Sequence, residues 1–302
     1  MPANPARPFR FGVVAAQAAT GEEWIGRARR AESLGFATFV VPDTAGHTLS
    51  PMPALGVLAG ATTTLRLGTY VIANDFRNPV LLARECATLD VLSGGRFELG
   101  LGAGRPGVEA DNRQLGIPFD PGGVRVARLA EALGLVKTLL AGEPATAPGP
   151  HYAAAGAQPY PRPAQRPRPP VLVAASGPRL LALAAREADI VAIGGRPDEG
   201  EAGIGERIDR LRRAAPERFP ELELNVNLVA VGERVHPAVA ARFGLDPDQL
   251  IRSGSPLVLT GTADQMVERL ERTREALGVS YVTMPDAFMD ACAPVVERLA
   301  GR

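Results

Sequence analysis

Apolar and polar positions along the chain alternate between two patterns. Short apolar runs rich in valine, isoleucine and leucine are typical of buried strands, and longer stretches with apolar residues three or four positions apart are typical of amphipathic helices. The predicted strands span residues 10–16, 37–41, 65–73, 97–102, 171–175, 190–193, 222–231 and 281–284. The predicted helices span residues 22–34, 52–62, 79–92, 124–140, 178–187, 204–214, 263–277 and 291–299, with a shorter one near 246–252. Strands that each precede a helix in this way favour an α/β fold of the (β/α)8 TIM-barrel type over an open doubly wound sheet.

The segment from residue 144 to residue 170 breaks this pattern. It is dense in proline and ends in PYPRPAQRPRPP, so it cannot form a helix or a central strand. We therefore expect a single barrel domain over residues 1–302, with a Pro-rich insertion between strands four and five that loops over the barrel. A mobile interdomain linker is the alternative. In such a barrel the chemistry lies at the carboxyl ends of the strands, so the residues that follow each strand are the candidates for function.

Composition and charge narrow the class of protein. The 302 residues are 46% hydrophobic and 22% charged, and 33 basic residues balance 33 acidic ones. With no basic surplus we expect neither nucleic-acid nor membrane binding. Cys86 and Cys292 lie outside any CxxC pair and are expected to be reduced. The opening MPANPARPFR lacks an apolar signal core, and no apolar run is long enough for a membrane span, so we expect a cytoplasmic location.

Glycine marks the end of the fourth predicted strand. In the stretch TLDVLSGGRFELGLGAG, a Gly-Gly pair ends a helix, and Gly100, Gly102 and Gly104 follow at every second position. Glycine weakens a strand interior and usually marks a place where something approaches the backbone closely. Either a flat ring lies across the carboxyl end of this strand, or a crowded barrel interior admits only small residues. The GxGxxG formed by residues 102–107 is weak evidence for a dinucleotide site, because Pro106 interrupts the turn.

Two neighbouring loops could bind an anion. Ser176 and Gly177 follow the fifth strand and open a helix, where free backbone N–H groups, the helix dipole and a hydroxyl meet. Gly194, Gly195 and Arg196 follow the sixth strand and add flexible backbone and a guanidinium. Each loop alone is typical of a plain turn and cap, but the two together favour a phosphate.

Few other residues could carry chemistry. Asp43 follows the second strand, with Thr44 and His47 close behind, and Asp43 could equally cap a turn. No cluster has the spacing of metal ligands and no GxSxG motif is present, so we predict neither a metal nor a serine nucleophile. An apolar barrel mouth with phosphate loops and without such groups favours an organic cofactor that carries out the difficult step.

The run NPVLLARECATLDVLSGGRFELGLGAG, residues 78–104, resembles the bacterial luciferase-like superfamily. Together with RRAESLGFATFVVPD and ATTTLRLGTYVIANDFRNP it is more similar to the branch that uses coenzyme F-420, an 8-hydroxy-5-deazaflavin, and the resemblance covers nearly the whole chain. It implies a ring across the barrel mouth and a phosphate tail near strands five and six. It also implies hydride transfer between the deazaflavin C5 and a small organic substrate, and a homodimer formed through the helices near strands two and three.

The same resemblance gives roles to residues. Asp43 matches the family aspartate beside the ring. The third strand matches one that carries a non-proline cis peptide, expected here at Tyr70-Val71 or at Val71-Ile72. The cofactor-binding residues implied in this way are Asp43, Tyr70, Val71, Ile72, Gly102, Gly104, Ser176, Gly177, Gly194, Gly195 and Arg196.

Two positions depart from the family pattern. Many relatives carry histidine directly after the aspartate, where this chain has Thr44, and an aromatic residue or glutamate after the strand-four glycines, where it has Arg105. His47 could replace that histidine or be a solvated loop residue. Arg105 could bind a substrate carboxylate, polarise a carbonyl or form a salt bridge. His47, Arg105 and Thr44 are therefore the catalytic candidates.

Two other functions are compatible with the sequence. One is an FMN-dependent two-component monooxygenase, and the other is a cofactor-binding barrel without turnover. The loop at residues 105–121 and the Pro-rich insertion are expected to select the substrate, but neither carries a readable chemical code.

Overall fold

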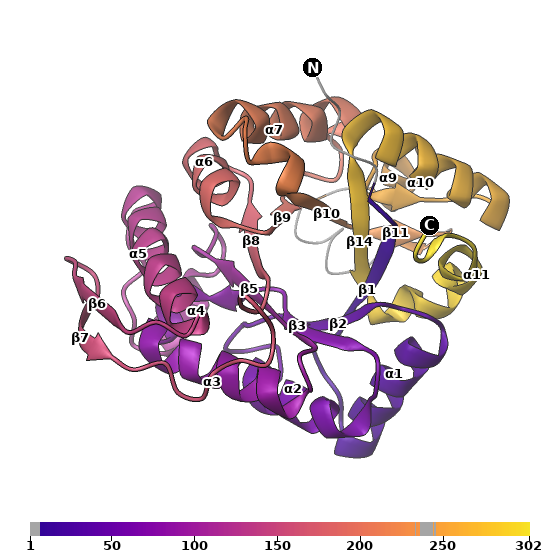
Figure 1. Cartoon of the computed structure of the whole chain (residues 1–302). Coiled ribbons are helices and arrows are strands. Elements are labelled where there is room, and N and C mark those ends of the chain that lie inside the picture. Colours follow the sequence, from indigo (N-terminus) through magenta and orange to yellow (C-terminus); the bar gives the residue numbers. More distant parts are fainter. Residues whose placement is uncertain (1–6, 233, 236–243, 245) are drawn as a thin grey trace. The chain divides into compact units, whose positions relative to one another are not determined.

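The computed structural model of the chain describes residues 7–232, 234–235, 244 and 246–302, and strands and helices alternate along it (Figure 1). The chain divides into two compact units. The first comprises residues 1–15, 30–39 and 175–302, and the second comprises residues 16–29 and 40–174. The elements with residues in both units are α1 (Gly21–Ser33), β2 (Thr38–Val41) and β8 (Val171–Ala175).

The first unit holds a parallel sheet in the order β1, β14, β10, β9. Its strands are β1 (Arg10–Val14), β9 (Ile190–Ile193), β10 (Glu223–Asn227) and β14 (Val279–Pro285). Its helices are α6 (Pro178–Glu187), α7 (Gly200–Ala214), α9 (Pro247–Arg252), α10 (Ala263–Leu277) and α11 (Met289–Leu299). A small second sheet is formed by β11 (Ala230–Val231), β12 (Arg234–Val235) and β13 (Val258–Leu259). The predicted strand at 222–231 is therefore two strands, β10 and β11, that belong to different sheets.

Helix α10 shows how local sequence sets the bounds of an element. The Thr262 hydroxyl accepts from the backbone N–H of Gln265, and the Gln265 side chain accepts from the backbone N–H of Thr262. This capping box satisfies two of the N–H groups that a helix start leaves open. At the other end Gly278 adopts the left-handed conformation, with φ of 72°, that glycine accepts most readily. The helix is consequently the one predicted, residue for residue.

In the second unit, β5 (Phe97–Gly102) pairs in parallel with β3 (Arg66–Thr69), β4 (Ile72–Ala73) and β8. The helices are α2 (Pro51–Ala61), α3 (Pro79–Leu92), α4 (Glu109–Gln114) and α5 (Gly122–Leu140), and η1 (Asn74–Phe76) is a short 3-10 turn. The predicted strand at 65–73 is divided into β3 and β4. Every residue of β5 is buried, as its apolar run predicted, and α3 packs against both α2 and α5.

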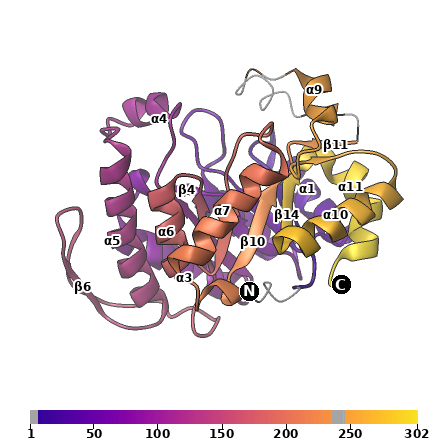
Figure 2. The ribbon, with the colours of Figure 1, turned by 90° about the horizontal axis from the view of Figure 1, so that it is seen from above.

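The Pro-rich insertion contains an antiparallel hairpin of β6 (Ala145–Pro148) and β7 (Ala153–Ala157), which projects beyond α5 (Figures 1 and 2). These short strands were not predicted from the sequence. The end of the insertion is fixed by Gln165. Its backbone N–H and side-chain Nε2 donate to the buried Asp90 carboxylate at 2.9 and 2.6 Å, and Nε2 also lies 2.7 Å from the carbonyl of Phe97.

Candidate functional site

The strand predicted to carry a cis peptide ends in an irregular segment. The peptide bond between Tyr70 and Val71 is cis, at one of the two expected positions. The Tyr70 N–H donates to the carbonyl of Val41, at 2.8 Å, and so ties the segment to the end of β2. Tyr70 and Val71 are half-buried, whereas Ile72 is fully buried and pairs with Leu101 of β5. A ligand could therefore reach this segment at Tyr70 and Val71, but not at the side chain of Ile72.

The glycines of β5 face this segment. A Cβ atom at Gly100 would lie 2.0 Å from the carbonyl oxygen of Thr69, and one at Gly102 would lie 2.7 Å from Cγ2 of Val71. The Thr69 hydroxyl accepts from Gly100 N and donates to Gly100 O, both at 2.8 Å. The backbone of Thr69 and the side chain of Val71 thus require glycine at both positions, as the crowded-interior alternative expects. Contact of Gly102 with a ring stays a prediction.

A different constraint requires glycine at position 104. Its φ of 71° is in the left-handed region that favours glycine, and a Cβ atom there would lie 2.9 Å from Nη1 of Arg125. Arg125 is buried, donates to the carbonyl of Ala103 at 3.1 Å, and places its guanidinium carbon 4.0 Å from the ring centroid of Phe119. Gly104 and Arg125 together set the direction in which the chain leaves β5.

Asp43 follows β2, as predicted, and its side chain is 9% exposed. Its Oδ2 accepts from the backbone N–H of Ala73 at 3.1 Å and forms an ion pair with Arg77, whose Nη2 also lies 3.4 Å from Oδ1. Asp43 and Arg77 therefore hold the end of β4 beside the cis segment. The sequence analysis missed Arg77, although an arginine between a strand end and a proline-led helix was an available signal.

Thr44 and His47 lie on the turn after Asp43. The Thr44 N–H donates to the hydroxyl of Thr48 and its carbonyl accepts from the same hydroxyl, both at 3.1 Å. His47 is exposed, and its carbonyl accepts from Nε2 of Gln17 at 2.7 Å. Among the described residues the imidazole of His47 has no hydrogen-bond partner, so the structure fits a solvated histidine that is available to a ligand.

Arg105 lies in the loop after β5, and its side chain is exposed. Partial desolvation lowers the pKa of Arg105, whereas Asp111 and Glu109 of α4 act in the opposite direction. Within the described part of the chain its guanidinium forms neither a hydrogen bond nor an ion pair. The salt-bridge alternative is therefore not realised, and the cation is open to a ligand. Neither Arg105 nor His47 contacts Asp43 through a hydrogen bond or ion pair in those same residues.

In the first unit, the two loops predicted to bind a phosphate lie against each other. Ser176 and Gly177 are exposed and lead into α6, which begins at Pro178. Gly177 is the N-cap and no side chain caps this helix, so its first-turn N–H groups are open. The Gly194 N–H donates to the carbonyl of Ala175 at 2.8 Å, and a Cβ atom at Gly194 would lie 3.3 Å from Cβ of Ser176. Gly194 thus permits the close approach of the two loops.

The rest of the second loop is held by charged pairs. Arg196 donates from Nε and Nη2 to the carboxylate of Asp198, both at 3.0 Å, and this contact raises the pKa of Arg196 and lowers that of Asp198. A Cβ atom at Gly195 would lie 3.1 Å from Oε2 of Glu199, which pairs with Arg207 at 2.7 Å. A phosphate that bound Arg196 would therefore compete with Asp198.

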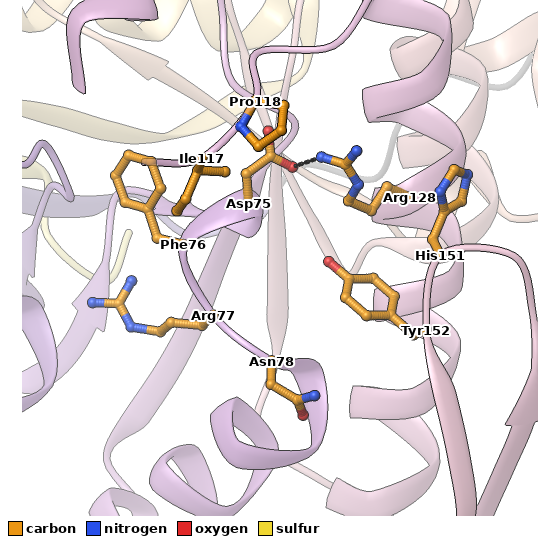
Figure 3. A pocket seen from close by; sticks show the side chains of 9 residues that line it. All are labelled: Asp75, Phe76, Arg77, Asn78, Ile117, Pro118, Arg128, His151 and Tyr152. Carbon is orange, nitrogen blue, oxygen red and sulfur yellow. Dashed lines mark hydrogen bonds and ion pairs between the residues drawn. The ribbon is translucent and has the colours of Figure 1, made fainter. Parts of the chain in front are cut away.

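A cavity of about 390 Å³ opens beside η1 in the second unit, and we call it the η1 pocket (Figure 3). Three segments form it: η1 with the two residues before α3, the loop before α5 together with α5 itself, and the turn of the β6–β7 hairpin. Its lining residues are Asp75, Phe76, Arg77, Asn78, Ile117, Pro118, Arg128, His151 and Tyr152. Because Arg77 also holds Asp43, the pocket adjoins the candidate ring-binding segment.

Two features are absent from the described residues. No group of three or more histidine, cysteine, aspartate and glutamate side chains there could hold a metal ion. In the same part of the chain, no helix combines the length and the apolar character needed to cross a membrane.

Comparison with known proteins places the chain in a family. The model of the family described as "Luciferase-like monooxygenase" matches residues 8–242. The chain belongs to the luciferase-like monooxygenase family. This confirms the resemblance seen in residues 78–104.

The relatives of this chain include enzymes that are named as dependent on coenzyme F-420. The F-420-dependent glucose-6-phosphate dehydrogenase of Beutenbergia cavernae is 40% identical over 167 residues, which cover 53% of this chain and 48% of that protein. The alignment thus spans about half the length of that relative. The enzyme of the same name from Nakamurella multipartita is 30% identical over 276 residues, covering 86% of this chain and 80% of that protein.

A solved structure supports the fold. The coenzyme F-420-dependent tetrahydromethanopterin reductase from Methanopyrus kandleri is similar with a TM-score of 0.77, at 20% sequence identity, over 97% of this chain and 99% of that one. The predicted (β/α)8 TIM barrel of the luciferase-like type is therefore confirmed.

Proposed function

We propose that the protein is an oxidoreductase that uses coenzyme F-420 and transfers a hydride between the deazaflavin and a small organic substrate. The observation that carries this proposal is the 30% identity, over 276 residues, to an F-420-dependent glucose-6-phosphate dehydrogenase. When bound, the cofactor would supply the hydride chemistry, and the protein would bind and orient it.

The loops of the first unit fit the phosphate tail of such a cofactor. The start of α6 presents uncapped N–H groups and the positive end of the helix dipole, and Ser176 and Gly177 stand at its entrance. Arg179 in the first turn is exposed and forms no ion pair among the described residues. Gly194 keeps a second backbone close to Ser176, so we assign Ser176, Gly177, Gly194, Gly195 and Arg196 to the tail.

In the second unit we assign Asp43, the Tyr70-Val71 segment, Gly102 and Gly104 to the ring. Asp43 is supported by its position, because Arg77 and Ala73 hold it beside the cis segment. Thr44, His47 and Arg105 would orient the substrate or move its proton. His47 and Arg105 are better supported in such roles than Thr44. Within the described ranges the imidazole of His47 and the guanidinium of Arg105 have no partner, whereas the backbone of Thr44 is hydrogen-bonded to Thr48.

A binding titration tests the proposal. Purified protein would be titrated with the deazaflavin and, separately, with flavin mononucleotide, and cofactor fluorescence would be followed. We expect micromolar or tighter binding of the deazaflavin and weaker binding of the mononucleotide. Failure to bind the deazaflavin would contradict the proposed function.

The family name itself supports a second candidate, a two-component monooxygenase that uses flavin mononucleotide. The two functions differ in their need for oxygen, because hydride transfer to or from a deazaflavin does not consume it. Turnover that continues in anaerobic solution supports the dehydrogenase, and turnover that stops without oxygen supports the monooxygenase.

We also propose a homodimer and a cytoplasmic location. Exposed apolar side chains on α2 and α3 support the first, and their test is described in the Discussion. Two buried cysteines that form no disulfide, Cys86 and Cys292, support the second.

A further inference from the structure

The η1 pocket is where the two segments expected to select the substrate come together. Ile117 and Pro118 belong to the loop after β5, and Tyr152 belongs to the turn of the β6–β7 hairpin. The third wall, η1, directly follows β4 and is held to Asp43 through Arg77. The pocket therefore connects the candidate ring-binding segment to both segments expected to select the substrate, within one unit.

The cations of the pocket already have anionic partners. Arg128 donates to Asp75 at 2.7 Å and forms a second ion pair with Asp120. Arg77 is paired with Asp43. A phosphate or carboxylate in the pocket would have to displace one of these carboxylates or lie beside it, and either arrangement is unfavourable. The charges thus favour a neutral ligand.

The pocket has both apolar and polar lining. Figure 3 shows Phe76 and Ile117 together on one side, with the paired guanidinium of Arg77 beside them, and Tyr152, His151 and Arg128 on the other side. The Tyr152 hydroxyl accepts from Nδ2 of Asn74 at 3.1 Å, and its own hydrogen has no acceptor among the described residues. Burial raises the pKa of Tyr152, so the hydroxyl remains a donor at neutral pH. A ligand with an apolar body and one oxygen that accepts a hydrogen bond fits these two sides.

We propose that the η1 pocket binds the substrate, and that this substrate is a neutral alcohol or ketone with an apolar body rather than a phosphorylated or carboxylated molecule. The reaction, though not the binding, rests on the proposed function. In that reaction the alcohol would lose a hydride from its carbon to bound deazaflavin and a proton from its oxygen to solvent, which would leave a carbonyl; reduction of the ketone would be the reverse.

Binding can be measured without turnover. Saturation-transfer NMR on the full chain would use cyclohexanol and cyclohexyl phosphate as probes, because the two differ only in the phosphate. We expect cyclohexanol to bind and cyclohexyl phosphate to bind at least about tenfold more weakly, since its charges would meet carboxylates that are already in place.

Three variants locate the binding. Tyr152→Phe removes one hydrogen-bond donor and should weaken cyclohexanol binding about three- to tenfold. Ile117→Trp should also weaken it, because the larger side chain occupies part of the apolar side of the pocket. Tyr160→Phe is the matched control: Tyr160 lies on the same Pro-rich segment with 77% of its surface exposed, and this variant should bind cyclohexanol normally.

Two results would overturn the proposal. Equal or tighter binding of cyclohexyl phosphate would identify an anion site, and unchanged cyclohexanol binding by the Ile117→Trp variant would place the probe elsewhere. A deazaflavin titration of the unaltered protein separates this proposal from the proposed function. Bound deazaflavin without bound cyclohexanol contradicts the pocket alone, and bound cyclohexanol without bound deazaflavin contradicts the function alone.

Discussion

At the scale of single residues, Asp43 has a structural role that is compatible with its proposed place beside the ring. It stands where the family places an aspartate beside the ring, and it also fixes local structure through Ala73 and Arg77. A carboxylate with this little exposure is stabilised only if its partners remain in place. We therefore expect a substitution at position 43 to change the stability of the fold as well as the binding of a ligand.

Asp43→Asn should lower the free energy of unfolding by about 1.5–3 kcal/mol, because it removes charge-assisted hydrogen bonds between a nearly buried carboxylate and an arginine that is 20% exposed. Urea denaturation measures this change. Asp290→Asn is the control: Asp290 pairs with Arg30, but the two side chains are 76% and 54% exposed, so we expect a change of only about 0–1 kcal/mol. Equal effects at the two sites would show that the Asp43 pair is no stronger than a surface pair.

Substitutions at the glycines of β5 test whether backbone atoms or side-chain atoms exclude a Cβ atom from this strand. Gly100→Ala should lower the free energy of unfolding by about 3 kcal/mol or more, since the new Cβ atom would meet backbone at Thr69. Gly102→Ala meets only the Val71 side chain, so a second change, Val71→Ala, should recover part of its loss. Gly56→Ala, in α2 with nothing within 4 Å, should instead raise stability by about 0.5–1 kcal/mol. If Val71→Ala rescued Gly100→Ala as well, the side chain rather than the backbone would be the obstacle.

At the scale of elements, the start of α6 and the loop after β9 act as one candidate anion site. Ser176→Glu should abolish binding of the deazaflavin tail through like-charge repulsion. Asp198→Asn should tighten that binding about two- to fivefold, because it frees Arg196 from its carboxylate. Fluorescence titration at low and high salt measures both. Unchanged affinity in the Ser176→Glu variant would remove the phosphate assignment from these loops.

The elements also show what the sequence could predict. Helices with caps and a clear apolar stripe, such as α10, and compact apolar strands, such as β8 and β9, were predicted correctly because local signals define them. The β6–β7 hairpin was missed because its strands are short, rich in alanine, and next to prolines. In the site, the cis segment followed from family resemblance. Arg77 and Thr69 act there through contacts between residues distant in sequence. The position of Arg77 between a strand end and a proline-led helix was a local signal, whereas no such signal marked Thr69.

At the scale of the whole molecule, apolar side chains on α2 and α3 are exposed, and packing within one chain does not account for their exposure. Val57, Leu81, Val91 and Leu92 are 48%, 57%, 46% and 67% exposed, although isolated surface leucines alone would need no explanation. The two helices pack together in the second unit (Figure 1). Leu81 also lines a groove of about 170 Å³ with Pro159 and Tyr160. Such a surface supports the homodimer that the family resemblance implies.

The double variant Leu81→Glu with Leu92→Arg should therefore convert a dimer to a monomer. Both changes place a charge that an apolar interface would have to desolvate, which is strongly unfavourable. Size-exclusion chromatography with light scattering at micromolar protein measures the mass. Leu115→Arg is the control, because Leu115 is 47% exposed but lies at the end of α4, outside the α2–α3 surface, and this variant should stay dimeric. A double variant that remains a dimer would place the interface on another surface, and an unaltered chain with the mass of a monomer would contradict the dimer itself.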